Sequence, residues 1–140
     1  MKMSYNAEVV RGWPYDGALD RAETIKTGVT LSNGDWVVKQ SDNTVDLASA
    51  TKTAAAGLVI RGNGDSGSGA YTNKATVLWS NFVVKVKNYT AGAWAPGSPV
   101  TVASGKVTIG VQGTDPIIGY VLDVIAASSS NDASLVIQVK

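Results

Sequence analysis

The chain has 140 residues, with 12 basic and 11 acidic side chains, a formal net charge of +1, and neither cysteine nor histidine. The near balance of charges, without a basic stripe or an acidic tail, argues against nucleic acid as a partner. The missing cysteines exclude disulfides and thiolate metal sites, and the missing histidines exclude the commonest general base and metal ligand. No apolar run reaches the roughly 18 residues of a membrane-spanning helix, and we predict no membrane partner, cofactor or metal.

The first 27 residues differ from the rest of the chain. Their apolar side chains follow neither a helical nor a strand period, and Pro14 pushes the residue before it away from the helical region. This segment either folds back over its own domain or forms an arm whose large apolar groups dock on a neighbouring chain. We therefore predict an irregular N-terminal arm over residues 1–27. Its candidate interface residues are Val9, Val10, Trp13, Pro14, Tyr15 and Leu19.

Residues 28–140 are predicted to form one β domain. Short runs of Val, Leu, Ile and Thr alternate apolar with polar side chains, and turn residues separate these runs. The dipeptide Asn33-Gly34 is a strong hairpin signal, and residues 97–110 predict two short strands joined by a tight turn. Gly105 supplies the conformational freedom that this turn requires.

An internal repeat organises this domain. A Gly-x-x-Val motif, a polar turn, a second valine and a later apolar run opened by glycine occur twice, with nearly the same spacing. The matching positions are Gly34 and Gly97, Val45 and Val107, and Gly57 and Gly119. One such unit cannot bury its apolar face alone, whereas two units together can. We therefore predict an all-β fold, a single β-barrel or β-sandwich built from two pseudo-repeated strand units.

The sequence offers little catalytic chemistry. Gly62, Gly64 and Gly67 match a dinucleotide-binding fingerprint, but the helix that such a site needs does not follow, so we predict a surface loop. Glu8 and Glu23 lie in the leader, and most aspartates lie at turns, where Asp bonds the local backbone. We predict that the protein is not an enzyme. A hydrolase that uses two carboxylates is the weakest hypothesis, because it needs two acidic side chains converging in a cleft.

Four tryptophans raise the possibility of sugar binding, since an aromatic face can stack on a pyranose ring. Trp36 and Trp79 lie inside expected strands, so we assign them to the core or to an interface. Trp94 follows in a loop rich in Gly, Ala and Pro and is the candidate for an exposed platform. It is also a further candidate interface residue beside those of the leader. A carbohydrate- or receptor-binding module on a virion or cell surface is therefore the alternative function.

The chain after the leader resembles a known family. The Gly-x-x-Val motifs at residues 34–37 and 97–100, the apolar runs at 57–60 and 119–122, and the turn and strand at 105–108 carry the resemblance. In these features the chain is similar to the small β-rich capsid decoration (cement) proteins of tailed bacteriophages. The leader departs from the pattern of this family.

The resemblance implies a structural virion protein with no catalytic residues. Such a protein binds the outside of the expanded phage head and clamps neighbouring subunits of the major capsid protein, usually as a homotrimer. The expected partners are therefore the major capsid protein and further copies of this chain. The N-terminus lacks the apolar stretch of a secretory signal, which predicts synthesis in a cytoplasm, that of the host if the resemblance holds. The resemblance implies a place on the capsid exterior.

Overall fold

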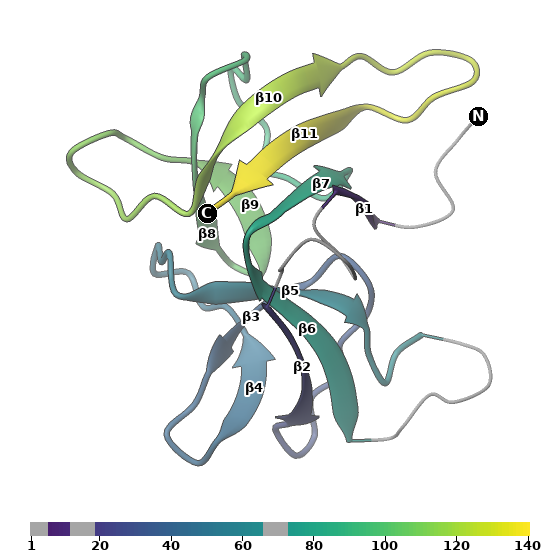
Figure 1. Ribbon diagram of the computed structural model, residues 1–140, viewed down its shortest axis with the longest axis vertical. Coiled ribbons are helices and arrows are strands. Elements are labelled where there is room, and N and C mark those ends of the chain that lie inside the picture. The colour runs from purple at the N-terminus through teal and green to yellow at the C-terminus, as the bar shows by residue number, and fades with distance from the viewer. Residues whose placement is uncertain (1–5, 12–18, 66–72) are drawn as a thin grey trace.

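The computed structural model describes residues 6–11, 19–65 and 73–140 (Figure 1). In these residues the regular secondary structure consists of β-strands without any helix, which confirms the predicted all-β class. The described part of the chain therefore contains no helix that is long and apolar enough to cross a membrane. The glycine-rich loop predicted from residue 62 onward lies outside the described residues from position 66 to 72.

Five strands of the first half form a closed barrel, in the spatial order β2-β4-β3-β5-β6. Their bounds are β2 (Leu19–Ile25), β3 (Trp36–Lys39), β4 (Thr44–Leu47), β5 (Ala56–Arg61) and β6 (Lys74–Ser80). Val37, Val45, Val59 and Val77 are fully buried and belong to the cluster that fills this barrel. Each comes from a different strand. They point into the barrel because the side chains of a strand alternate between the two faces of the sheet, and one of these faces is the interior.

The five strands of the second half and β1 from the N-terminal segment form a six-stranded sheet in the order β1-β7-β11-β10-β8-β9. The bounds are β1 (Ala7–Arg11), β7 (Phe82–Val86), β8 (Pro99–Ala103), β9 (Lys106–Ile109), β10 (Gly119–Ile125) and β11 (Ser134–Val139). An isolated parallel bridge joins Tyr89, just after β7, to Val107 of β9. The sheet therefore curls back on itself, as the first barrel does where β2 pairs in parallel with β4.

The predicted repeat is present and extends over five strands in each half. The order β4-β3-β5-β6 corresponds to β9-β8-β10-β11, and β2 corresponds to β7. The turns before β3 and β8 match in backbone geometry: Gly34 and Gly97 have φ values of +96° and +90°. Gly34 N–H donates to Val59 O at 3.0 Å, and Gly97 N–H donates to Val121 O at 2.7 Å.

The pairing registers agree as well. In the first unit Leu58 pairs with Trp36 on one side and with Leu78 on the other. In the second unit Tyr120 pairs in the same way with Pro99 and Gln138. The register shifts immediately after Val59 in β5 and after the matching Val121 in β10. A β-bulge thus recurs at the same position, and each unit forms its own curved sheet instead of contributing half of one barrel.

The prediction of an irregular leader is wrong for residues 7–11 and 19–25, which are the strands β1 and β2. β1 pairs with β7, and β2 pairs with both β6 and β4. Asn81 alone separates β6 from β7, so these two strands form a nearly continuous path through both sheets. β2 pairs along the first part of this path and β1 along the second. Two features hide the apolar–polar alternation of these strands in the sequence. In β2 the charged Glu23 takes a buried position, and in β1 the pairing register shifts after Val9.

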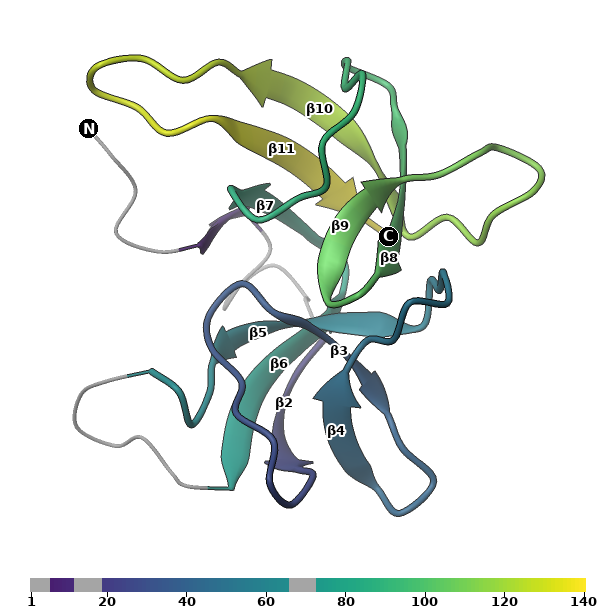
Figure 2. The same ribbon diagram turned by 180° about the vertical axis from the view of Figure 1, so that it is seen from behind.

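The strands β7–β11 lie above the strands β2–β6 in Figure 2, and a buried contact joins the two units. Trp36 of β3 is fully buried and stacks on Phe82 of β7, with ring centroids 6.4 Å apart. The turn between β8 and β9 rests on the first unit through two backbone bonds. Trp36 N–H donates to Gly105 O at 3.2 Å, and Ser104 N–H donates to Ser49 O at 2.6 Å. Apolar side chains from the outer face of the first barrel therefore share one core with the second unit.

Replacing Trp36 by alanine is expected to destabilise the protein by about 3–5 kcal/mol, because it empties this shared core. The matched control is Trp94→Ala, whose side chain is only half-buried, and its expected loss is smaller. Urea unfolding monitored by circular dichroism measures both. An equal or larger loss for Trp94→Ala would contradict the assignment of Trp36 as the principal contact between the units.

Candidate functional site

The predicted interface residues of the leader lie on different parts of the fold. Val9 is half-buried on β1 and packs against the large core, whereas Val10 is 60% exposed. Leu19 begins β2, where its backbone pairs with Ser80, and its side chain is outside the described part. Trp13, Pro14 and Tyr15 also lie outside the described residues. The interface assignment therefore stays a prediction, with Val10 as its exposed described member.

Trp94 is not a free aromatic platform. Its ring is half-buried against the core and meets Tyr89 edge to face, with centroids 6.0 Å apart. Its indole N–H donates to Thr90 O at 2.8 Å. These contacts anchor the connection between β7 and β8 to the end of the second sheet. A sugar ring stacked on Trp94 would have to compete with Tyr89 for the aromatic surface.

Asn33 holds three segments of the chain together, which the sequence did not predict. Its side-chain oxygen accepts the N–H of Ala7 at 2.9 Å, and its side-chain nitrogen donates to Ile60 O at 2.9 Å. Its backbone N–H donates to the carboxylate of Asp65 at 2.9 Å. Asn33 therefore links β1, the connection before β3 and the end of β5. The sequence indicated only a hairpin dipeptide at this position.

Asp35 and Asp65 lie beside this network. The pKa of Asp35 is raised chiefly by burial and further by the charge of Asp65, while the N–H of Ser32, which donates to its carboxylate at 2.8 Å, opposes the shift. These two carboxylates bind backbone N–H groups of nearby loops. They hold the loop structure rather than forming a pair that is open to a substrate.

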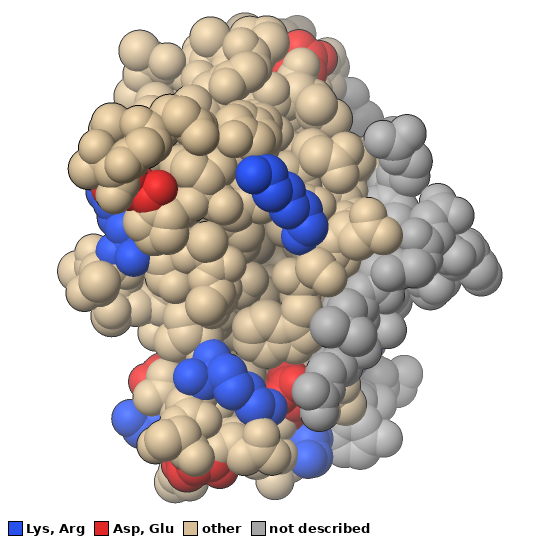
Figure 3. Space-filling model, turned by 60° about the vertical axis from the view of Figure 1, so that its left-hand side comes forward, with Lys and Arg blue, Asp and Glu red and all other residues tan. Residues whose placement is uncertain are grey.

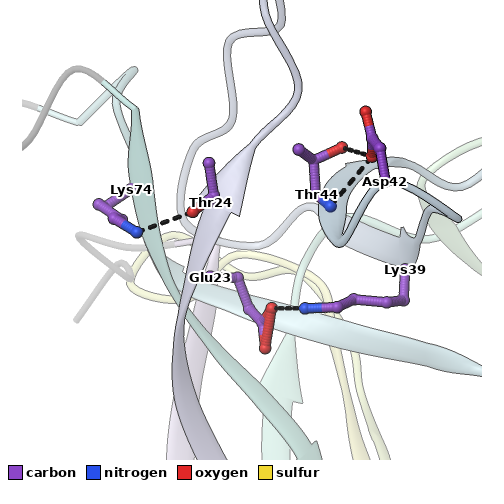
Figure 4. A network of polar contacts seen from close by, with 6 residues as sticks. All are labelled: Glu23, Thr24, Lys39, Asp42, Thr44 and Lys74. Atoms are coloured by element: carbon purple, nitrogen blue, oxygen red, sulfur yellow. Dashed lines mark hydrogen bonds and ion pairs between the residues drawn. The ribbon is translucent and has the colours of Figure 1, made fainter.

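A buried carboxylate of the first barrel pairs with a lysine that remains partly exposed (Figure 4). Glu23 of β2 is 2% exposed and forms an ion pair with the Nζ of Lys39 on β3. By register, these positions correspond to Val86 and Val102 of the second unit, both of which are buried in its core. The first unit thus carries an ion pair where the second carries two valines. The sequence could have revealed this difference only if the two repeats had been aligned by their strand register.

A shallow hollow of about 440 Å³ opens at the end of the first barrel where β2 and β4 meet. Hydroxyl and amide side chains such as Thr27, Thr30 and Asn73 line much of it. None of its lining residues is acidic, so this hollow does not supply the acidic pair that a hydrolase would need. Within the described ranges, no group of three His, Cys, Asp or Glu side chains is placed to hold a metal ion.

Charged side chains are sparse on one face of the molecule. Figure 3 shows charged side chains scattered over a face made mostly of other residues, without a patch of one sign. Large apolar side chains are exposed at several places on the described surface. They are Val10, Leu47, Val111, Leu122 and Val124, with exposed fractions of 37–60%. Such a surface favours contact with another protein over attraction of a charged ligand.

One exposed ion pair connects the two units. The Nζ of Lys52, in the connection between β4 and β5, lies 3.0 Å from the carboxylate of Asp115, in the connection between β9 and β10. The same carboxylate accepts the N–H of Val111 at 2.8 Å. The hydrogen bond from Lys52, followed by that from Val111, lowers the pKa of Asp115 below its usual value near 3.8.

The charged pair in the barrel is expected to show strong coupling. Lys39→Val leaves the Glu23 carboxylate buried without its cation and should lower the free energy of unfolding by roughly 3 kcal/mol. The double variant Glu23→Val/Lys39→Val reproduces the valines of the second unit and should recover at least wild-type stability. Lys74→Val, an exposed lysine on β6, is the control and should change stability by less than about 0.5 kcal/mol. A double variant as unstable as Lys39→Val would contradict this account.

Acid should weaken the contact between the units through Asp115. Its pKa is lower in the folded state, so its stabilising contribution is present above its unfolded pKa and is lost as the pH falls through the folded pKa. Asp115→Asn should therefore reduce the dependence of the urea midpoint on pH below about pH 4. Lys52→Met should reproduce most of this change, because Lys52 is the first cause of the shift. An unchanged pH dependence in both variants would contradict the assignment.

Comparison of the chain with family models and with curated proteins found no match. The geometry of the two β units, their shared core and their exposed side chains is therefore what supports the function proposed below.

Proposed function

We propose that this protein is a structural virion protein, a capsid decoration protein of a tailed bacteriophage. It binds the outer surface of the expanded head and strengthens the contacts between neighbouring subunits of the major capsid protein. It acts as a homotrimer, and it is made in the host cytoplasm before it joins the particle. Its activity is binding, without a chemical step.

The observation that carries this proposal is the fusion of two β units into one body with apolar side chains exposed at its periphery. The shared core around Trp36 and Phe82 keeps the two units in a defined relation. Exposed side chains such as Leu122 and Val124 then stand at defined positions on the surface. A clamp between capsid subunits needs shape and area at several points, and many copies make modest contacts hold firmly.

The low charge of the surface also fits this role. Scattered lysines and aspartates keep the protein soluble, while the uncharged regions between them can pack against a partner without desolvating ions (Figure 3). The resemblance of residues 28–140 to decoration proteins, argued from the repeated glycine and valine motifs, points to the same function.

The test is binding to purified capsids of the phage that carries the gene. The protein should co-sediment with expanded capsids, saturate at a fixed number of copies per capsid and raise the temperature at which the capsids release DNA. Compact capsids before expansion are the control and should bind little, because their subunits are arranged differently. Electron microscopy of the saturated particles should place the density outside the head. A protein that stays in the supernatant with expanded capsids would refute the proposal.

A further inference from the structure

The second half of β10 is an open sheet edge. β8 pairs with β10 only at Gly119 and Tyr120, and the bonds between the β8 side and β10 end at Val121. Beyond this point Leu122 is the unpaired residue of the β-bulge, and residues 123–125 continue as a strand that pairs with β11 on one side. Among the described residues, no strand pairs with the other side. The hairpin of β10 and β11 extends at the top of the molecule in Figure 1.

The equivalent edge in the first unit is covered. There the chain after the bulge in β5 lies beside residues 29–33, which run in the opposite direction. Gly64 N–H donates to Leu31 O at 2.8 Å, and Leu31 N–H donates to the side-chain oxygen of Asn63 at 2.8 Å. A Cβ atom at Gly62 would overlap with the Leu31 carbonyl, so the two backbones are in direct contact. Leu31 itself is fully buried.

The second unit lacks this cover. Val124 takes the position of Gly62, and the connection before β8 is anchored elsewhere, through Trp94 and Thr90. The edge therefore presents Leu122 and Val124, which are 48% and 37% exposed. Asp123 lies between them, and its carboxylate accepts the N–H of Val124 at 2.9 Å. One backbone donor of this edge is therefore already bound to a neighbouring side chain.

We propose that the β10 edge at residues 122–125 receives an extended segment of a capsid subunit, which adds to the sheet as an antiparallel strand. This inference rests on the function proposed above. The first unit indicates what kind of segment fits this edge. Its own edge is covered by residues 29–33, whose Leu31 is buried, so an apolar segment is expected on β10 as well. The incoming segment carries apolar side chains against Leu122 and Val124 and a lysine or arginine near Asp123. A second copy of the same edge is disfavoured, because it would bring two Asp123 carboxylates together.

Two lysine variants test this surface on expanded capsids. Leu122→Lys places a charge on the edge and should weaken co-sedimentation at least about tenfold. Thr114→Lys is the control, because Thr114 is an exposed polar residue on the connection after β9, and its binding should stay within about twofold of wild type. Thermal unfolding verifies that both variants fold.

Cysteine labelling gives an independent readout, since the chain has no cysteine of its own. Leu122→Cys should react with maleimide at least about tenfold more slowly on the capsid than in solution, as a buried contact requires. Thr114→Cys, at an exposed polar position, should react equally fast in both states. Unchanged labelling at position 122, equal protection at both positions, or full binding by Leu122→Lys would overturn the edge assignment. If wild-type protein does not bind capsids at all, the proposed function itself has failed, which is a distinct result.

Discussion

The arrangement of the molecule depends on the burial of Trp36 between the two β units. Its ring stacks on Phe82, and its backbone N–H holds Gly105 at the tip of the hairpin between β8 and β9. A closed barrel of five strands has little interior volume, so the first unit encloses only a small core of its own. The outer face of the first barrel supplies the missing apolar surface, and both units gain stability from one shared cluster.

The same fold in both units makes their differences informative. The row of Trp36, Leu58 and Leu78 is fully buried because it faces the second unit. The matching row in the second unit contains Pro99 and Gln138. Pro99 has no N–H and so cannot repeat the bond that Trp36 makes to Gly105. A further unit therefore cannot dock on this face in the same way.

These differences also locate the proposed function. A position that is covered in one unit and open in the other marks a place where the two units have taken different roles. The edge of β10 is such a place, and the ion pair of Glu23 and Lys39 is another. For a protein that acts by binding, the open edge is the more informative of the two. Unpaired backbone groups and exposed apolar side chains are the features that strand addition requires, and this is why we propose a strand-like partner there.

The sequence by itself determined the all-β class, the hairpin at residues 97–110 and the repeat, because strand alternation and turn glycines are local signals. It did not reveal β1 and β2, since their pairing with β7 and β6 depends on residues distant in the chain. The packing of Trp94, the role of Asn33 and the burial of Glu23 were likewise decided by tertiary contacts. Burial and cross-strand register belong to the whole fold, so only the assembled sheets show which side chains meet and which edge stays open.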